Sequence, residues 1–334
     1  MQIIQNRRTF VAGAAAAGAA SFFGTATKAW AEPPPETTRI RLVRIPSICQ
    51  APQYIAEELL RSEGFTEVTY LQKKGTADIE TALASGEADL NGHFAAPLLI
   101  RLEAGDPIVI LAGLHVGCFE LFGTDRVQAI RDLKGKTVAV PSLDSSRYVF
   151  LASMTAYVGL DLHKDINFVT HPGPESMRLL SEGKIDAYLG FPPEPQEMRE
   201  QQIGHVVIDS TVDGPWSQYF CCMMAGNREF VRKYPVATKR ALRAILKAAD
   251  FCASDPEQSA QFIVDQGYTK RYDHALQAMK ALPYQWREYS AEDTLRFYAL
   301  RLHEVGMLKS TPQKLLAQGT DWRFLKELKQ ELKQ

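Results

Sequence analysis

Short apolar runs alternate with amphipathic segments over the first two thirds of the chain, and this alternation constrains the fold more than any other feature. The runs at 40–45, 108–113 and 136–141 have the length and composition of strands, and the segments at 76–85 and 147–158 have the spacing of helices. Regular alternation of the two is typical of a sheet covered by helices. The sequence therefore predicts an α/β protein.

The pattern changes near residue 227, after which helix follows helix. Typical helix-starting residues recur in this region, at Pro235, Asp255, Ser290 and Thr311. A helix gains most of its stability by burying an apolar face against other elements. We therefore expect this helical C-terminal tail to pack on the first α/β unit.

A tail that returns to the first unit requires the chain to pass twice between two lobes. The chain has 334 residues and is long enough to build both. We place the two crossovers near 119–124 and 212–223. This division assigns residues 39–120 and 221–334 to lobe 1 and residues 125–212 to lobe 2.

One short pattern, a helix followed by glycine, two further residues and aspartate, occurs once in each half of the chain. Gly86 and Gly183 can adopt the left-handed conformation that ends a helix, and the acid three residues later starts the next strand. Ligands of α/β sheets bind beyond the carboxyl ends of the strands, where helix N-termini also present free N–H groups. The loops after these two strands, 92–95 and 191–194, are therefore expected to face a cleft.

The N-terminus has the features of an export signal. Arg7 and Arg8 precede a weakly apolar stretch rich in alanine and glycine, which ends in a small-residue triplet at Ala31. This order is typical of a twin-arginine signal, which is read by a receptor and passes folded proteins. We predict that residues 1–31 are a removable twin-arginine signal peptide, that residues 32–38 are a linker, and that the mature protein works in the periplasm.

Composition excludes several other classes. The 38 basic residues nearly balance the 39 acidic ones, and no basic stripe of the kind that binds nucleic acid is present in the sequence. After the leader, no stretch approaches the 18 or so unbroken apolar residues of a transmembrane helix. We expect a monomer that binds no nucleic acid.

Two parts of the sequence carry a more specific signal. They are the stretch at 81–113, which includes L-A-S-G-E-A-D-L-N-G-H-F, and the pair L-K-G-K-T-V-A-V-P at 133–141 and L-L-S-E-G-K-I-D-A-Y-L-G-F-P-P-E-P at 179–195. Together they resemble the solute-binding proteins of nitrate, sulfonate, taurine and thiamine-precursor importers, a family that also contains the yeast-type thiamine-pyrimidine synthases. The resemblance implies a two-lobed periplasmic-binding-protein fold of type II, a small-molecule ligand and an inner-membrane ABC permease as partner. For such a binding protein we expect no catalytic residue, no metal and no cofactor.

The first lobe offers candidate ligand contacts in the loops that follow its strands. Gln50 and Tyr54 can form hydrogen bonds near the end of the first strand, where the resemblance places a ligand-contacting loop. Thr76 can equally cap the helix that follows it, and His93 can equally be a structural hydrogen-bonding residue. The candidates in this lobe are Cys49, Gln50, Tyr54, Lys74, Thr76, His93 and Phe94.

The second lobe has hydroxyl groups in the loop at 142–147, where a helix start would stabilise an anion. Asp144 in the same loop would repel an anion and favour an amine. Glu194 could neutralise a ligand amine or a heteroaromatic nitrogen, or it could stabilise the first turn of its own helix. Because of these acids, the sequence slightly favours an organic ligand with such a nitrogen over nitrate. The candidates in this lobe are Ser142, Asp144, Ser145, Ser146, Arg147, Phe191 and Glu194.

Trp216 and Tyr219 precede two adjacent cysteines on the return crossover, in a segment that we predict to be a strand. There the two aromatic rings could stack on a flat or apolar ligand. Cys221 and Cys222 would point to opposite faces of such a strand and could not both line one site. Five cysteines leave at least one unpaired within a monomer, and their spacing matches no paired metal-binding motif. Whether any pair forms a disulfide stays open.

Three functions are compatible with these features. The main interpretation is the substrate-binding component of an ABC importer, which is not an enzyme. The resemblance leaves an iron-dependent enzyme of the pyrimidine-synthase type as an alternative, using His93 and the cysteines. The Cys-rich run of those synthases is shortened here to Cys221 and Cys222, and no G-x-S-x-G nucleophile motif is present in the sequence. A periplasmic sensor subunit with the same fold is the third possibility.

Overall fold

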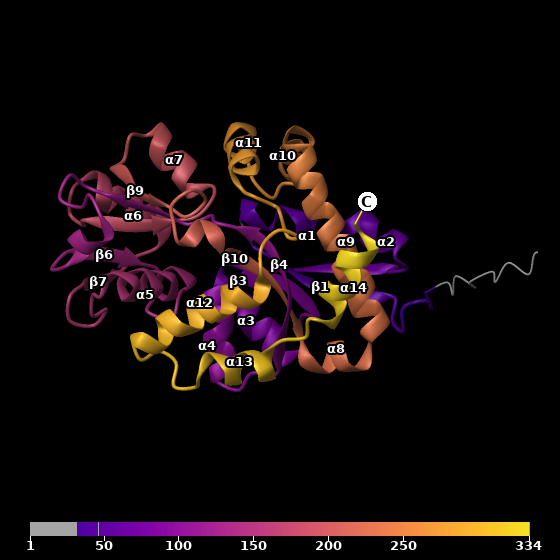
Figure 1. Ribbon diagram of the computed structural model, residues 1–334. Coiled ribbons are helices and arrows are strands. Elements are labelled where there is room, and N and C mark those ends of the chain that lie inside the picture. Colours follow the sequence, from indigo (N-terminus) through magenta and orange to yellow (C-terminus); the bar gives the residue numbers. More distant parts are fainter. Residues whose placement is uncertain (1–31, 46, 334) are drawn as a thin grey trace, which may run out of the picture. The chain divides into compact units, whose positions relative to one another are not determined.

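Strands and helices alternate as far as the ninth strand, and helices follow one another after the tenth (Figure 1). The computed structural model describes residues 32–45 and 47–333, so the predicted signal peptide at 1–31 lies outside the described residues. The strands are β1 (Arg39–Arg44), β2 (Glu67–Gln72), β3 (Leu90–Phe94), β4 (Ile108–Val116), β5 (Glu120–Gly123), β6 (Thr137–Val140), β7 (Asn167–Thr170), β8 (Ala187–Gly190), β9 (His205–Asp209) and β10 (Phe220–Asn227).

The helices vary from one turn to more than five. They are α1 (Ala51–Ile55), α2 (Glu57–Ser62), α3 (Thr76–Ser85), α4 (Ala95–Glu103), α5 (Ser146–Val158), α6 (Gly173–Ser181), α7 (Glu194–Glu200), α8 (Arg228–Lys233), α9 (Pro235–Ser254), α10 (Pro256–Asp265), α11 (Tyr272–Ala281), α12 (Ala291–Glu304), α13 (Pro312–Gly319) and α14 (Arg323–Glu331). Three short 3₁₀ helices lie at Ile48–Gln50, Ile130–Leu133 and Trp216–Gln218.

The described strands fall into two groups. In the first, β10 lies between β3 and β4 in an antiparallel sheet, and β1 pairs with β2 in parallel. The Val43 N–H on β1 donates to the Asn91 side chain on β3 over 2.7 Å, which ties these two pieces together. The second group is one sheet with the order β7-β6-β8-β5-β9. We call the elements from β5 to β9 the second lobe, on the left of Figure 1, and the remaining elements the first lobe.

Two connections join the lobes, and they are hydrogen-bonded to each other. The outgoing connection, 117–119, leads from β4 to β5, and the incoming connection, 210–219, leads from β9 to β10. The Ser210 hydroxyl donates to the Phe119 carbonyl over 2.7 Å and accepts from the Cys118 N–H over 3.1 Å. The two segments therefore pass between the lobes as a pair.

The crossovers lie slightly earlier in the chain than the sequence predicts. Residues 120–123, expected in the first crossover, already form β5 and pair with β8 and β9. Residues 220–223, expected in the second, already belong to β10. Pairing with neighbouring strands, which the sequence does not display, decides where each connection ends.

Two helical segments are short. α1 and α2 are divided at Ala56, and α1 is held in the core by Gln53, whose amide donates to the Val43 carbonyl and accepts from the Gly92 N–H. Between β5 and β6 the chain forms only the 3₁₀ turn Ile130–Leu133.

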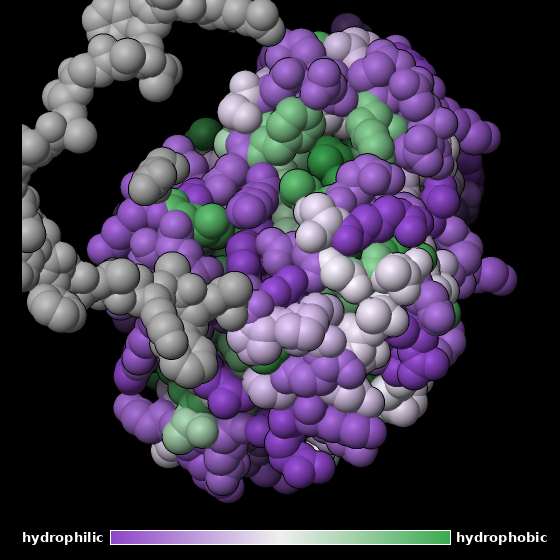
Figure 2. Space-filling view, turned by 90° about the vertical axis from the view of Figure 1, so that its right-hand side faces the viewer, coloured by the Kyte–Doolittle hydropathy of each residue, from purple (hydrophilic) through white to green (hydrophobic). Residues whose placement is uncertain are grey.

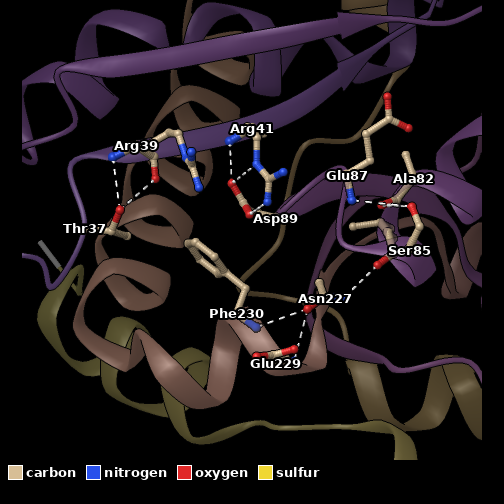
Figure 3. A network of polar contacts seen from close by, with 11 residues as sticks. Thr37, Arg39, Arg41, Ala82, Ser85, Glu87, Asp89, Asn227, Glu229 and Phe230 are labelled. Carbon is tan, nitrogen blue, oxygen red and sulfur yellow. Dashed lines mark hydrogen bonds and ion pairs between the residues drawn. The ribbon is translucent and has the colours of Figure 1, made fainter.

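The aspartate of the repeated pattern fastens adjacent elements in the first lobe. Gly86 ends α3 with a φ of +73°, the predicted left-handed conformation. Asp89 then accepts hydrogen bonds from the Arg41 N–H over 2.7 Å and from the Arg41 guanidinium over 2.5 Å (Figure 3). In the same network, Asn227 caps α8 by accepting from two of its backbone N–H groups.

The second lobe repeats this arrangement. Gly183 follows α6 with a φ of +66°, and Asp186 accepts from the Thr137 N–H over 2.8 Å and from Arg126 Nε over 2.5 Å. In both lobes the acid binds a backbone N–H at the start of a neighbouring strand. The two aspartates therefore hold adjacent strands of each lobe together.

The helical tail packs on the first lobe, as predicted. α9 contacts α1, α2 and β4, and α12 contacts α4 as well as α5 of the second lobe. The Glu36 carboxylate, in the predicted linker, accepts from the Val236 and Ala237 N–H groups over 2.9 and 2.8 Å. An acid at this position satisfies N–H groups that a helix leaves unpaired and complements the helix dipole.

The surface is mainly polar where Figure 2 shows it, from the right-hand side of Figure 1. Hydrophobic areas on this face are small and separated by hydrophilic ones, over the part formed by described residues. Within the same residues, no helix has both the length and the apolar character needed to cross a membrane.

Gly113 provides a test of the packing between β4 and β10. A Cβ added there would overlap the ring of Phe220, which is fully buried. We expect Gly113→Ala to lower the free energy of unfolding by about 1–3 kcal/mol, as overpacking of a core does. Urea denaturation measures the change. Gly214→Ala, whose Cβ would meet nothing within 4 Å, is the control and should change stability by less than about 0.5 kcal/mol; equal effects of both variants would contradict the packing.

Candidate ligand-binding site

A pocket of about 430 Å³ lies between the lobes, where the starts of α3, α5 and α6 converge. The first N–H groups of a helix have no partner within the helix, so each start presents free donors. Its apolar lining residues are Ile45, Ala77, Pro141, Pro172, Pro174, Phe191 and Pro193. The other lining residues are Lys74, Gly75, Thr76, Ser142, Ser145, Ser146, Arg147, Gly173 and Glu194.

The loop before α5 brings two hydroxyl groups with different roles to the pocket. The Ser145 hydroxyl caps α5, since it accepts from the Tyr148 N–H over 3.3 Å and donates to the Ser142 carbonyl over 2.7 Å. The neighbouring Ser146 hydroxyl is buried and has no hydrogen-bond partner within the described chain. Buried polar groups are rarely left unpaired, so Ser146 is a donor in need of a ligand or water.

Arg147 and Glu194 form a buried ion pair beside these hydroxyls. One guanidinium nitrogen lies 2.6 Å from Glu194 Oε2, to which the Tyr188 hydroxyl also donates over 2.9 Å. Gly173 allows this approach, because a Cβ there would overlap the Glu194 carboxylate. Burial disfavours the charged guanidinium, but Glu194 outweighs it and raises the pKa of Arg147. Arg147 Nε is buried without a partner among the described residues, and the Phe191 ring lies 4.5 Å from the guanidinium carbon.

Two other acids of the second lobe, Asp144 and Glu120, do not line this pocket. Asp144 is exposed and accepts from the Ser142 hydroxyl over 2.5 Å. Glu120 is buried at the start of β5, paired with Arg199, and burial together with Asp209 raises the pKa of Glu120 to about 7. Glu194 is thus the one acid among the described lining residues, and its charge is balanced by Arg147.

Gln50 and Tyr54 are buried inside the first lobe. The Gln50 amide donates to the Gly92 carbonyl over 3.0 Å, and the Tyr54 hydroxyl donates to the Ile45 carbonyl over 2.9 Å. Burial raises the pKa of Tyr54. Both side chains hold α1 against the strands, and neither is among the pocket-lining residues.

Three further candidates of the first lobe, Cys49, His93 and Phe94, are buried as well. His93 Nε2 lies 2.8 Å from Glu80 Oε1, which is the structural hydrogen bond considered from the sequence. Cys49 is fully buried and does not line the pocket. Phe94 comes nearer, since its ring centroid lies 5.4 Å from that of Phe191, which does line it. Phe94 therefore supports the pocket wall from behind.

Trp216 and Tyr219 pack against helices and do not line the pocket. Trp216 is buried and packs edge-to-face on Tyr157 of α5, and Tyr219 stacks on Phe297 of α12, with ring centroids 5.4 and 4.1 Å apart. The predicted strand begins only at Phe220, and 216–218 forms a 3₁₀ turn. Both rings are therefore already covered by protein.

The prediction that Cys221 and Cys222 cannot share one site is wrong. Their Sγ atoms and that of Cys118 all lie within 4.8 Å of one another. The register of β10 against β4 shifts on both sides of Cys222, and such bulges let two successive side chains point the same way.

Sequence reasoning missed the loop that leads into α6. Pro172, Gly173 and Pro174 line the pocket, as does Ile45 at the end of β1. The available signal was positional, because Pro-Gly-Pro lies just beyond the carboxyl end of a strand, β7, where α/β proteins bind ligands. None of these residues carries a polar side chain, so no chemical motif drew attention to them.

A larger hollow of about 710 Å³ lies elsewhere, at the C-terminal ends of α5 and α12. Its lining includes Arg131, Asp161, His163 and Glu304. Helix C-termini present carbonyl groups and the negative end of the dipole. The hollow is lined by Arg131, His163 and Arg301 but lacks the convergent helix starts of the smaller pocket, which we therefore take as the candidate site.

The sequence model of the NMT1-like family matches residues 33–264. The chain belongs to the NMT1-like family. Its similarity to the taurine-binding periplasmic protein of Escherichia coli K12 is 23% identity over 204 residues, which is 60% of this chain and 62% of that protein. The chain thus spans less than two thirds of the length of this relative.

This NMT1-like chain is also similar to an enzyme and to a second binding protein. The 4-amino-5-hydroxymethyl-2-methylpyrimidine phosphate synthase THI13 of Saccharomyces cerevisiae is 23% identical over 233 residues, covering 64% of this chain and 67% of the synthase. The crystal structure of the periplasmic nitrate-binding protein NrtA from Synechocystis PCC 6803 superposes with a TM-score of 0.74 at 17% identity, covering 90% of each chain. The predicted two-lobed periplasmic-binding-protein fold is confirmed.

The ion pair between Arg147 and Glu194 can be tested by stability. Glu194→Gln would leave a guanidinium that is 10% exposed without its counter-charge, so we expect the free energy of unfolding to fall by about 2–4 kcal/mol. The double variant Arg147→Met/Glu194→Met should lose less free energy of unfolding than the sum of the losses in Arg147→Met and Glu194→Met, measured by chemical denaturation. Glu175→Gln, which breaks an exposed pair on α6, is the control and should cost less than about 0.5 kcal/mol. Strict additivity of the two buried substitutions would contradict the pairing.

Proposed function

We propose that this chain is the substrate-binding component of an ABC importer and captures a small organic anion between its lobes. The observation that carries this proposal is a pocket built by both lobes, in which three helix starts meet the unpartnered donors of Ser146 and Arg147. The names of its relatives, a taurine-binding and a nitrate-binding periplasmic protein, support a binding role over catalysis.

The electrostatics of the pocket favour an anion. Helix starts carry partial positive charge, and Lys74 adds a full one. Glu194 is balanced by Arg147, and Asp144 lies outside the lining. The slight preference for an amine derived from the sequence is therefore replaced by a preference for a carboxylate, sulfonate or similar group.

The apolar part of the lining favours a ligand with an organic body. Ile45, Ala77, Pro141 and Phe191 provide carbon surface on several sides of a volume of about 430 Å³. Ligand sites of this kind bury apolar groups and use a few placed donors for orientation. A bare inorganic anion would leave this surface without a partner.

Contacts between the lobes indicate how capture would work. The Ile48 N–H donates to the Pro192 carbonyl over 3.4 Å, and Arg271, directly before α11, lies 2.9 Å from Glu200 on α7. A ligand that touches α3 and α5 together binds the closed arrangement better than an open one. The free energy by which the ligand favours the closed state equals the difference between its binding free energies for the closed and open states.

The cellular setting follows from the leader and from the resemblance. A twin-arginine signal at residues 1–31 would deliver the folded protein to the periplasm, where an inner-membrane ABC permease would receive its ligand. Closure would present both lobes to this permease in one defined orientation. A sensor subunit would use the same closure to report to a membrane partner, and a pull-down from membranes separates the two roles.

An enzyme of the pyrimidine-synthase type is the second candidate, favoured by the yeast relative and by the group of Cys49, His115 and Cys222, whose ligand atoms lie within 4.8 Å of one another. These residues are buried and do not line the pocket, so they do not fit an iron centre that reacts with a substrate held there. Stoichiometric iron in the purified protein, measured by elemental analysis, would favour the enzyme.

The proposed ligand class can be tested with a thermal-shift and calorimetry panel of alkanesulfonates, carboxylates, nitrate and amines. We expect an organic anion to raise the melting temperature, as any ligand of the native state does in excess over its Kd. Ser146→Ala should weaken its binding about tenfold, the equivalent of one hydrogen bond to a charged group, and Lys74→Ala should weaken it several-fold. Ser181→Ala, outside the lining, is the control. Binding of amines alone would contradict the proposal.

The contact between α7 and α11 gives a second test, of closure. Arg271 lowers the pKa of Glu200, so the pair is complete above the ordinary carboxyl pKa and is lost as pH falls through the lowered value. Arg271→Ala should therefore increase the radius of gyration at pH 7, by small-angle scattering without ligand, and the difference from the wild type should disappear only as pH falls well below the ordinary carboxyl pKa of about 4.3. Arg178→Ala, which breaks pairs within α6, serves as control. Identical scattering of all three proteins at pH 7 would contradict a role in closure.

A further inference from the structure

Four of the five cysteines meet where the connections between the lobes enter the first lobe. Cys118 and Cys221 have their Sγ atoms 2.9 Å apart. Cys222 lies within 4.8 Å of both, and also of Cys49 and of one ring nitrogen of His115. The side chains of these four cysteines and of His115 are all buried. The pocket and the mechanism of closure use none of them.

Cys118 and Cys221 lie beside each other where the two connections meet the first lobe. Cys118 lies on the outgoing connection, between β4 and β5, and Cys221 is the second residue of β10, directly after the incoming connection. They are 103 positions apart in the sequence, and the chain between them contains the entire second lobe. Ser210 already holds the same two connections together through the Phe119 carbonyl.

The two thiols differ in acidity in a way that suits exchange chemistry. Burial raises the pKa of Cys118 well above its usual value. Burial acts in the same direction on Cys221, but hydrogen bonds from the thiols of Cys118 and Cys222 together outweigh it and lower the pKa of Cys221. The thiolate is the attacking species in thiol–disulfide exchange, so Cys221 is the nucleophile of the pair.

We infer that Cys118 and Cys221 are joined by an intramolecular disulfide in the mature protein, which links the outgoing and incoming connections between the lobes. The inference rests on their distance, their shared burial and their places on the two connections, together with the proposed export to an oxidising compartment. It does not depend on the identity of the ligand. Cys49, Cys222 and Cys252 stay as thiols.

Formation of the bond proceeds by two exchanges with an external disulfide. The Cys221 thiolate attacks one sulfur of R–S–S–R, forms a mixed disulfide and releases R–S⁻. The Cys118 thiolate then attacks Cys221 Sγ, closes the protein disulfide and releases the second R–S⁻. The protons of the two protein thiols end on the released thiolates, so two protein thiols are oxidised and one external disulfide is reduced to two thiols. Because both Sγ atoms are buried and the protein is proposed to arrive folded, the first attack takes place when the connections open transiently.

The link would have two consequences for the fold. It closes a loop that contains the whole second lobe, and long loops lose the most conformational freedom in the unfolded chain. It also holds the two connections at one point near the hinge. The lobes can then rotate about this point, but the connections cannot separate, so closure follows a narrower path.

Thiol mapping tests the pairing directly. The full chain is refolded from denaturant in oxidised and reduced glutathione, its free thiols are alkylated in denaturant, and it is digested without reduction for mass spectrometry. We expect one cross-linked peptide pair, and fragmentation between the adjacent cysteines should assign the link to Cys118 and Cys221. The Cys222→Ser variant should keep the link, and Cys221→Ser should lose it. Five alkylated cysteines, or a link that persists in Cys221→Ser, would overturn the inference.

Thermal unfolding provides a measurement that does not depend on mapping. Oxidised wild type should melt roughly 5 °C or more above the fully reduced wild type, because the link constrains the unfolded chain. Cys118→Ser should melt at the same temperature under both conditions. Cys252→Ser, which alters another buried thiol, is the matched control and should retain the full difference. An equal melting temperature of oxidised and reduced wild type would overturn the inference. Neither readout involves ligand or export, so failure here leaves the importer proposal to its own test.

Discussion

The arrangement depends on one strand, β10, which lies between β3 and β4 and hydrogen-bonds to both. Since β4 leads into the second lobe and β10 returns from it, their pairing turns that lobe into a long insertion held at both ends. The Ser210 hydroxyl joins the two connections again just before the second sheet begins. The starts of α3 and α5 face one pocket because these contacts set how the lobes meet.

Local patterns predicted most of the fold, because they act over a few neighbouring residues. Gly86 and Gly183 end helices in the left-handed conformation as expected, and the strands after them begin within one residue of the predicted acid, at Leu90 and Ala187. The same holds for the loop with Ser145 and Ser146, whose position at a helix start places them in the pocket. Residues defined by local position were therefore predictable.

Residues whose role depends on distant partners were not. Tyr54 and His93 have chemistry suited to a ligand, but each has a buried partner that no spacing reveals, the Ile45 carbonyl and the Glu80 carboxylate. The parallel directions of Cys221 and Cys222 result from register shifts against β4, which arise only when the strands pair. A polar residue after a strand indicates the correct edge of a sheet, and packing decides whether it faces the cleft or the core.

The balance of charge in the pocket explains why the protein is stable without a ligand. An unpaired guanidinium at the buried position of Arg147 would destabilise the ligand-free protein, and Glu194 prevents this. Because the pair is internally neutral, the proposed attraction for an anion is left to the helix starts, the Ser146 hydroxyl and Lys74 at the edge. The helix starts and Lys74 carry partial or solvent-exposed charge, which costs little when no ligand is bound, whereas the buried Ser146 hydroxyl needs a partner. A water molecule can supply that partner when no ligand does, so under the proposed function the site can release its ligand as well as bind it.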